Sequence, residues 1–221
     1  MEAHARSGLV APASDDACSR ARRGCDRKLE GPRLAASQKN GGPQVSFVFI
    51  DESGFSEGSV IRSTWAPRGK TPVLRTKLRS WKRMSAIGAL SYRRCGAARI
   101  FLRLHRGEVR APQIRQFLQH LLRHLPGRIV VLWDGLAAHR AKLIRTWADE
   151  HPRIRLVRLP AYAPELNPVE GLWAWTKGTR LANVCADSLD PVARRVRNGM
   201  RCARRSSALL WSFLEKAGLS L

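Results

Sequence analysis

Residues 129–133, Ile-Val-Val-Leu-Trp, form a continuous apolar run that ends on Asp134-Gly135. Five apolar residues bounded by a turn signal are typical of a strand that is buried on both faces. A carboxylate that directly follows such a strand lies at the carboxyl edge of the sheet, where open α/β sheets bind their ligands. Asp134 is therefore the first candidate for a functional residue.

A second informative segment is 162–173, Tyr-Ala-Pro-Glu-Leu-Asn-Pro-Val-Glu-Gly-Leu-Trp. Asn167-Pro168 predicts the start of a helix, with Asn as the N-cap and Pro at the first helical position. Between Asp134 and this helix, the sequence predicts a helix over 143–148 and a strand over 154–159. Such a crossover makes the two strands parallel neighbours, so Asp134 and Glu170 are expected to face one crevice.

Upstream, the sequence predicts a strand over 45–50, a strand at 63–65 followed by a basic turn, and two strands over 84–92 and 99–104. An amphipathic helix is predicted from Pro112 to Leu125, and further helices follow Asp190-Pro191 and Ser206. This order of elements predicts an α/β fold, a ribonuclease H-like mixed sheet. Three antiparallel strands precede two parallel strands, and helices flank the sheet.

Residues 1–44 differ from the remainder of the 221-residue chain, because they contain no aromatic residue and few large aliphatic ones. Such a segment cannot bury enough apolar surface to offset the conformational entropy that is lost on folding. We therefore expect a disordered or non-native N-terminal extension over 1–44, closed by the linker-like 40–43. Residues 45–221 are expected to form one domain.

The chain has 40 Lys and Arg residues against 17 Asp and Glu residues, which gives a formal net charge of +23. An excess of this size indicates a polyanionic partner, and it favours nucleic acid over an acidic membrane surface. No apolar run is long enough to cross a bilayer, and 8–11 is too short for a signal-peptide core. We therefore expect a cytoplasmic protein that binds nucleic acid and has no membrane partner.

Three acids are predicted to converge at one edge of the sheet: Asp51 at the end of its first strand, Asp134 at the end of its fourth strand (129–133), and Glu170 at a helix start. Mg²⁺ and Mn²⁺ prefer carboxylate and water ligands in near-octahedral geometry. Two such ions about 3.5–4 Å apart can activate the attacking oxygen in phosphodiester cleavage and stabilise the leaving one. In such a site Asp51 would bridge the ions, and Asp134 and Glu170 would each bind one.

Each acid also has a purely structural explanation. Asp51 and Asp134 are explained at least as well, taken singly, as turn residues after strands. Glu170 occupies the third helical position behind Asn167, where its side chain could reach back to form a capping box. The convergence of all three acids in a strongly basic protein favours the catalytic interpretation.

Four segments resemble landmarks of the DDE transposases. They are Phe-Ile-Asp-Glu-Ser-Gly-Phe at 49–55, Trp-Ala-Pro-Arg-Gly at 65–69, Leu-Trp-Asp-Gly at 132–135 with His139, and Leu-Pro-Ala-Tyr-Ala-Pro-Glu-Leu-Asn-Pro-Val-Glu-Gly-Leu-Trp at 159–173. The last segment is the most specific and is similar to the mariner superfamily, in particular its bacterial insertion-sequence branch, the IS-six-thirty group. The similarity covers roughly residues 45–218.

This resemblance implies that 45–221 is a ribonuclease H-like DDE catalytic domain, with Asp51, Asp134 and Glu170 as the catalytic, metal-binding triad. It implies a divalent-metal-dependent polynucleotidyl transferase that cleaves DNA at transposon ends and then joins the freed 3′ hydroxyl to target DNA. The implied cofactor is a pair of Mg²⁺ or Mn²⁺ ions, and the implied partners are transposon-end and target DNA. We also expect a homodimer when the enzyme is active, and association with the bacterial nucleoid.

Two alternative functions remain open. One is a catalytically inactive, truncated transposase remnant that binds DNA non-specifically through its positive charge. The other is a ribonuclease H-like structure-specific nuclease, which would share the site but prefer branched or hybrid substrates.

The chain departs from the family pattern in two places. Family members usually carry N-terminal helix-turn-helix modules, and residues 1–44 are too short and too poor in apolar residues to form them. We therefore expect a truncated copy, a wrongly started reading frame, or the catalytic half of a split gene whose helix-turn-helix half is encoded separately. Gly135 replaces the Asn that many relatives have after the second acid, which removes a polar group but no metal ligand.

Two accessory residues are considered beside the triad. His139 follows Asp134 by five residues and could orient a phosphate or a water molecule, although an exposed histidine at a helix start is the more common explanation. Asn167 is the second. His120 and His124 are spaced as in metalloprotease helices but lack the Glu after the first His, so zinc is not expected. Five irregularly spaced Cys residues without a CxxC pair predict free thiols.

Basic residues in the glycine turn, just beyond it and along the penultimate helix are predicted to contact DNA phosphates. Phosphate neutralisation dominates nucleic-acid affinity and makes it salt-dependent, although each residue alone is more simply explained as solvated surface. The predicted DNA-binding residues are Arg68, Lys70, Lys77, Arg79, Lys82, Arg83, Arg194, Arg195, Arg197 and Arg201.

Overall fold

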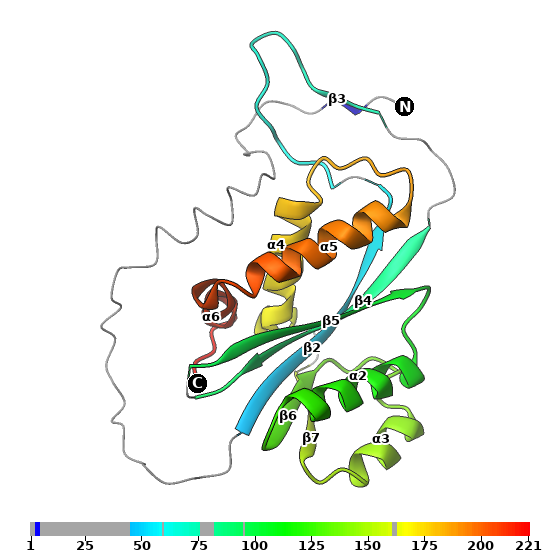
Figure 1. Ribbon diagram of the computed structural model, residues 1–221, viewed down its shortest axis with the longest axis vertical. Coiled ribbons are helices and arrows are strands. Elements are labelled where there is room, and N and C mark those ends of the chain that lie inside the picture. Colours follow the sequence, from blue (N-terminus) through cyan, green and yellow to red (C-terminus); the bar gives the residue numbers. More distant parts are fainter. Residues whose placement is uncertain (1–2, 5–44, 59, 76–81, 95, 161–162) are drawn as a thin grey trace, which may run out of the picture.

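The computed structural model describes residues 3–4, 45–58, 60–75, 82–94, 96–160 and 163–221. Its centre is a five-stranded mixed sheet in the order β5-β4-β2-β6-β7, with helices on both faces (Figure 1). The strands of this sheet are β2 (Val45–Ser56), β4 (Arg83–Tyr92), β5 (Ala98–Arg106), β6 (Arg128–Trp133) and β7 (Ile154–Arg158).

The strand directions confirm the predicted topology. β2 pairs antiparallel with β4, and β4 pairs antiparallel with β5. β6 then pairs parallel with β2, and β7 pairs parallel with β6. The two crossovers contain α2 (Ala111–His124), before β6, and α3 (Lys142–Asp149), before β7. Asp134 therefore lies at the carboxyl edge of two parallel strands, as the sequence predicts.

Each face of the sheet carries its own hydrophobic core. On one face the sheet packs against α4 (Pro168–Arg180), α5 (Leu189–Ala203) and α6 (Ser207–Lys216), and on the other against α2 and α3 (Figure 1). Side chains alternate along β2, because Phe49 belongs to the first core and Ile50 to the second. This alternation directs Asp51 toward α4 and Glu52 toward the face of α2 and α3.

β2 is longer than predicted. The sequence suggested a strand that ends at Ile50, but the ladder to β4 continues to Ser56, with Phe55 opposite Met84. Ser53 and Gly54 resemble a turn in the sequence, yet both β4 and the burial of Phe55 hold them in the strand. Asp51 thus lies inside the strand, opposite Gly88, and not at its end.

The predicted strand at 63–65 is wrong, because the chain there follows an irregular path and Trp65 is 61% exposed. The basic turn after it is confirmed by a hydrogen bond of 2.9 Å from the Lys70 N–H to the Pro67 carbonyl oxygen. A short strand, β3 (Val73–Leu74), follows and pairs antiparallel with β1 (Ala3–His4). The remainder of the predicted N-terminal extension lies outside the described residues.

The two edge strands of the sheet are rich in arginine. β5 carries Arg99, Arg103 and Arg106, and β7 carries Arg155 and Arg158. Charged side chains on an edge strand oppose pairing with a further strand. Within the described part of the chain, none of the helices has the length and apolar character that crossing a bilayer requires.

The expectation of free thiols is wrong at one position. Cys202, near the end of α5, is disulfide-bonded.

Candidate active site

The three predicted triad acids line one cavity of about 580 Å³. Asp51 comes from β2, Asp134 directly follows β6, and Glu170 lies in the first turn of α4. Phe49 pairs with Leu132 in the parallel ladder between β2 and β6. Asp51 lies two residues after Phe49 and Asp134 two residues after Leu132, so the two acids are at the same level of adjacent strands. The fold therefore brings together carboxylates that lie far apart in the sequence.

Asn167 fixes the start of α4 against β2. Its side-chain oxygen accepts a hydrogen bond of 3.2 Å from the Val169 N–H, which caps the helix as predicted. Its side-chain amide donates a bond of 3.2 Å to the carbonyl oxygen of Ile50, the residue before Asp51. Asn167 is buried, so its contribution to the site is to hold the helix that carries Glu170 beside the strand that carries Asp51.

Glu170 does not form the capping box that the sequence allowed. The Asn167 N–H, which a capping box would use, donates instead to the Pro164 carbonyl oxygen at 2.9 Å. Glu170 is exposed, and within the described residues its carboxylate makes no hydrogen bond or ion pair. Its carboxylate is therefore available to a ligand in the cavity.

Trp173, one helical turn beyond Glu170, contacts the first acid. Its indole N–H donates a hydrogen bond of 2.9 Å to Oδ2 of Asp51, and the side chain is otherwise buried in the core. The indole lies directly on Gly88, where an added Cβ would come within 2.5 Å of the ring. Only glycine leaves room for the indole at this position of β4.

The pKa of Asp51 is raised from 3.8 to about 7. Burial of the carboxyl group is the largest cause, and the negative charges of Glu170 and Glu52 raise the pKa further. The hydrogen bonds from the Glu52 backbone and from Trp173 act in the opposite direction. An acid whose ionisation is opposed by neighbouring acids is stabilised as a carboxylate when a cation enters the site.

His139 is buried beneath the second acid, and it is not an exposed residue at a helix start. Its ring stacks on Trp133, with centroids 4.2 Å apart and planes inclined by 6°. Nε2 lies 3.0 Å from Oε1 of Glu52, and Nδ1 lies 2.8 Å from Oδ1 of Asp134. The same oxygen of Asp134 accepts a hydrogen bond of 3.1 Å from the Leu136 N–H. These contacts fix one oxygen of the Asp134 carboxylate.

The pKa of His139 is raised overall. Burial alone would lower it, but the hydrogen bond and charge of Glu52, together with Asp134, outweigh the burial. Glu52 is a functional candidate that the sequence analysis missed. The signal was its position two residues after Ile50, on the face of β2 that carries the buried apolar residues Val48 and Ile50.

The donor set fits a hard divalent cation. Three carboxylates around one cavity supply the oxygen ligands that Mg²⁺ and Mn²⁺ prefer. Glu52, Asp134 and His139 also bring one potential ligand atom each within 4.8 Å of one another. Both ring nitrogens of His139 already face carboxylates, so His139 is less available as a metal ligand than the three cavity acids.

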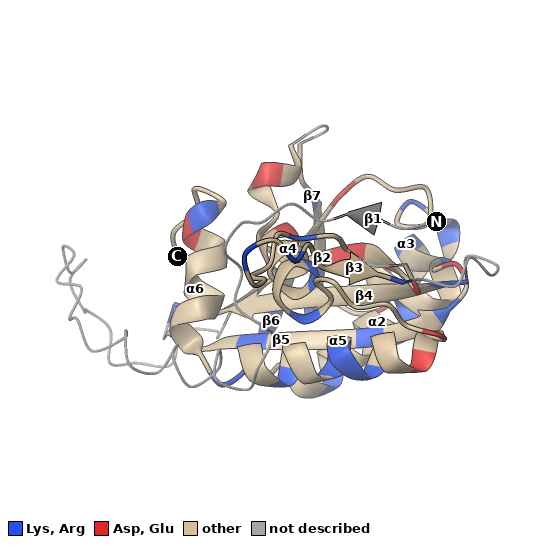
Figure 2. Cartoon of the chain, turned by 90° about the horizontal axis from the view of Figure 1, so that it is seen from above, with Lys and Arg blue, Asp and Glu red and all other residues tan. Residues whose placement is uncertain are grey.

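The predicted DNA-binding residues occupy two exposed regions. Arg68 and Lys70 lie in the turn after Pro67, and Lys82 and Arg83 lie at the beginning of β4. Lys77 and Arg79 lie outside the described residues. Figure 2 shows Lys and Arg along α5, whose exposed arginines include Arg194, Arg195, Arg197 and Arg201. All the described members of this set are available to a polyanion.

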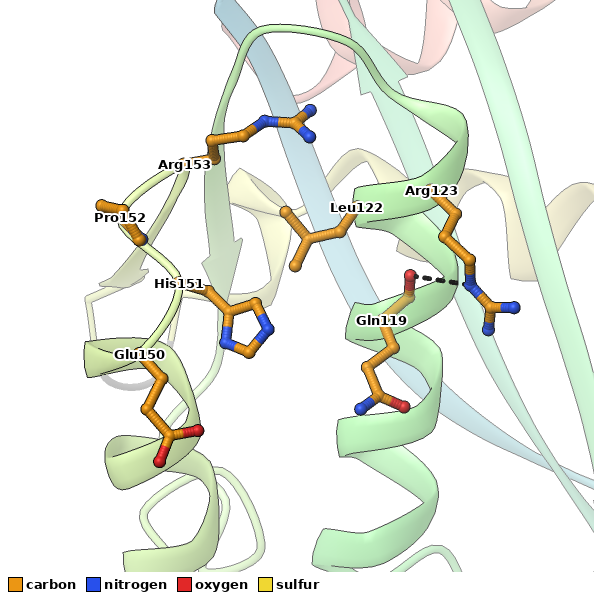
Figure 3. A pocket seen from close by; sticks show the side chains of 7 residues that line it. All are labelled: Gln119, Leu122, Arg123, Glu150, His151, Pro152 and Arg153. Carbon is orange, nitrogen blue, oxygen red and sulfur yellow. Dashed lines mark hydrogen bonds between the residues drawn. The ribbon is translucent and has the colours of Figure 1, made fainter.

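A different cavity, of about 510 Å³, lies between the end of α2 and the loop before β7 (Figure 3). Arg153 is held there by backbone carbonyl groups, with hydrogen bonds of 3.0 Å to Gly127 and 2.6 Å to Leu125. Because Arg153 precedes β7, this cavity is at the amino edge of the parallel strands. It is therefore at the opposite edge from the acids, and no triad residue lines it.

Comparisons with known proteins identify relatives of this site and fold. The family model of the DDE superfamily endonucleases matches residues 46–192, well over half of the chain. A stretch of 72 residues is 29% identical to an uncharacterised 39 kDa protein of insertion element IS630 from Shigella sonnei, over 33% of this chain and 21% of that protein.

Solved structures of the Mos1 mariner transposase share the fold. A paired-end complex with Mn has a TM-score of 0.52 at 17% identity, over 78% of this chain and 55% of that chain. A strand transfer complex has a TM-score of 0.50 at 18% identity, over 79% of this chain and 55% of that chain. This likeness confirms the predicted ribonuclease H-like arrangement. The chain spans about half the length of the Mos1 chains and about a fifth of the IS630 protein.

Proposed function

We infer that this chain, which belongs to the DDE superfamily endonuclease family, is the catalytic domain of a transposase of the IS630 and mariner group. The observation that carries this proposal is the shared cavity of Asp51, Asp134 and Glu170 at the carboxyl edge of the sheet. The reaction is cleavage of DNA at transposon ends, followed by attack of the freed 3′ hydroxyl on target DNA. The structures of Mos1 in paired-end and strand transfer complexes support DNA as the substrate.

Asp51, Asp134 and Glu170, which share one cavity, would hold a pair of divalent cations. When bound, the cations would activate the attacking oxygen and stabilise the leaving oxygen of the phosphodiester. The Mos1 paired-end complex with Mn supports a divalent cation as cofactor. The negative charge of Glu170, which helps to raise the pKa of Asp51, supports joint binding of a cation by these two acids.

The remaining residues of the site would orient these carboxylates. Trp173 holds one oxygen of Asp51, and His139 and the Leu136 N–H hold one oxygen of Asp134. Asn167 fixes the helix that carries Glu170. Preorganised ligands need no rearrangement when the substrate arrives, and this is how supporting residues contribute to catalysis.

The partners and location follow from the proposed reaction. The predicted DNA-binding residues, with the +23 charge of the chain, would neutralise phosphates of transposon-end and target DNA. We propose that the active enzyme is a homodimer in the bacterial cytoplasm, at the nucleoid. A helix-turn-helix half, encoded separately, would supply recognition of the terminal repeats.

The purified full chain tests this proposal on duplexes taken from the DNA that flanks its gene. With Mn²⁺, the wild-type protein is expected to nick the duplex, and the variants Asp51→Asn, Asp134→Asn and Glu170→Gln are not. Glu165→Gln is the matched control, because Glu165 precedes α4 by one turn, is exposed and does not line the cavity.

Equal nicking by wild type and triad variants would refute the assignment of the triad. Steeply salt-dependent binding without cleavage would identify the chain as an inactive remnant. Preferential cleavage of branched or RNA–DNA hybrid substrates would identify a structure-specific nuclease.

A further inference from the structure

A third cavity, of about 540 Å³, adjoins the cavity of the acids. Ala137 and Arg140 line both cavities, so the two share a wall. The stacked rings of His139 and of Trp133, the last residue of β6, also line it. This third cavity therefore lies directly beside the candidate active site.

Three arginines from different elements converge on this cavity. Arg140 ends the turn after Asp134, where its N–H donates to the Ala137 carbonyl oxygen at 3.1 Å. Arg145 belongs to the first turn and a half of α3. Arg158 is the last residue of β7 and pairs with Trp133, so its side chain lies on the same face of the sheet as the indole. We call this cavity the arginine pocket.

The arginine pocket has an unbalanced charge. Its lining residues are Trp133, Ala137, His139, Arg140, Arg145, Leu156 and Arg158, and they include no acid. The three arginines are exposed, and in the described structure none forms an ion pair. Guanidinium groups that converge without a counterion repel one another, and a phosphate both offsets this repulsion and matches their donor geometry.

The charges on the two sides of the shared wall are opposite. The cavity of the acids concentrates negative charge, which suits metal ions at a phosphodiester that is being cut. The arginine pocket concentrates positive charge, which suits a phosphate that is held and not cut. Arg140 stands at the boundary between them.

We propose that the arginine pocket binds a backbone phosphate of the DNA strand that runs through the catalytic cavity. The proposal rests on the proposed function only for the identity of that strand. Arg140, Arg145 and Arg158 hold the phosphate through charge-assisted hydrogen bonds, and the neighbouring linkage thereby enters the cavity of the acids in a fixed position.

The test compares two double variants of the full chain that remove the same charge. Arg145→Gln with Arg158→Gln removes two guanidinium groups from the pocket. Arg128→Gln with Arg155→Gln is the control, because both residues are exposed residues of the adjacent strands β6 and β7 and neither lines the pocket. Arg155 is on the opposite face of β7 from Arg158.

Binding of a fluorescein-labelled duplex is measured by anisotropy in EDTA over a range of salt concentrations. The pocket variant is expected to flatten the plot of log affinity against log salt by about 0.9 for each lost phosphate contact, and the control is not. Methylphosphonate linkages placed singly along the strand provide a second measurement. At the position whose phosphate the pocket binds, the neutral linkage is expected to weaken DNA binding by the wild type and to have no effect on DNA binding by the pocket variant.

Equal salt slopes for the pocket variant and the control overturn the proposal. So does stabilisation of the wild type by millimolar inorganic phosphate without a change in DNA slope, because the pocket would then bind a free anion. Mn²⁺-dependent nicking by the wild type is assayed in parallel. If the wild type nicks DNA but the pocket variant and the control have equal salt slopes, the proposed function stands and the phosphate-binding role of the pocket is refuted. If the salt slopes differ but the wild type does not nick DNA, the phosphate-binding role is supported and the proposed function is refuted.

Discussion

The indole N–H of Trp173 donates a hydrogen bond of 2.9 Å to Oδ2 of Asp51, across 122 positions of the sequence. This bond joins α4 to the central strand at a half-buried acid of the site. It also fixes one carboxylate oxygen, so that the other faces the cavity. The packing of the core and the geometry of the acids therefore depend on the same side chain.

Trp173→Phe is expected to lower the free energy of unfolding by about 2 kcal/mol, because it removes a hydrogen bond to an acid and part of a buried ring. It is also expected to raise the pKa of Asp51 further, since the indole bond lowers that pKa. The pH at which Mn²⁺ binding is half-maximal should move upward. Trp175→Phe, on the same helix but away from Asp51, is the control, and an equal pH shift in both variants would contradict the assignment.

Gly88→Ala is expected to destabilise the protein by about 1–3 kcal/mol, because its Cβ would lie 2.5 Å from the Trp173 ring. The displaced ring would also weaken the bond to Asp51 and lower the affinity for Mn²⁺. Gly54→Ala in β2 is the matched control, because nothing lies within 4 Å of a Cβ there. Denaturant unfolding and Mn²⁺ titration of both variants measure the difference. Similar losses of stability and of Mn²⁺ affinity in the two variants would show that the contact between Gly88 and Trp173 does not determine either quantity.

The stability of the metal-free protein is expected to fall as the pH rises through about 7. Asp51 binds its proton more tightly in the folded state, so its contribution decreases from its ordinary pKa of 3.8 up to its folded pKa. His139, whose pKa is also raised, contributes fully below 6.5 and loses that contribution as the pH passes its folded pKa. The titrations of Asp51 and His139 therefore both lower the free energy of unfolding as the pH rises.

Asp51→Asn separates these contributions. It is expected to raise the free energy of unfolding at pH 8 more than at pH 5, at about 1.4 kcal/mol for each unit of pKa shift that it removes. The variant should retain the smaller slope due to His139 and bind no Mn²⁺. Urea unfolding in EDTA at several pH values measures this, and a variant that is less stable than wild type at pH 8 would disprove it.

His139→Ala is expected to cost about 3 kcal/mol, because it leaves the Glu52 carboxylate buried without its partner. In a Glu52→Gln background, His139→Ala should lower the free energy of unfolding by less, because no buried charge is then left without a partner. A double-mutant cycle by denaturant unfolding gives the interaction energy between the two residues. Additive losses would mean that the 3.0 Å contact contributes no coupling.

Much of the fold follows from local patterns. Asn167-Pro168 predicts the first turn of α4, and the run 129–133 predicts β6, because capping and apolar periodicity act within a few residues. The end of β2 was not predictable in this way. Ser53 and Gly54 resemble a turn, and only their pairing with β4 keeps them in a strand.

The candidate site likewise has a part that the sequence predicts and a part that it does not. The three acids could be proposed from the sequence, because Asp51 directly follows the apolar run of β2, Asp134 follows β6, and Glu170 lies in the first turn of α4. Glu52 and the burial of His139 could not, because their contact joins residues 87 positions apart and exists only after β2 and β6 have paired. The bond from Trp173 to Asp51 also could not be predicted, because it depends on how α4 packs against β2.

The arginines of the two outermost strands also bear on how copies of this protein can meet. If two molecules aligned their free strand edges, Arg155 and Arg158 of one would approach the arginines of the other, on β5 or on β7. Like charges at that spacing repel, so a continuous ten-stranded β-structure shared by two molecules is disfavoured. A symmetric pair is therefore expected to form its interface through helices or loops, so that each sheet keeps its own five strands.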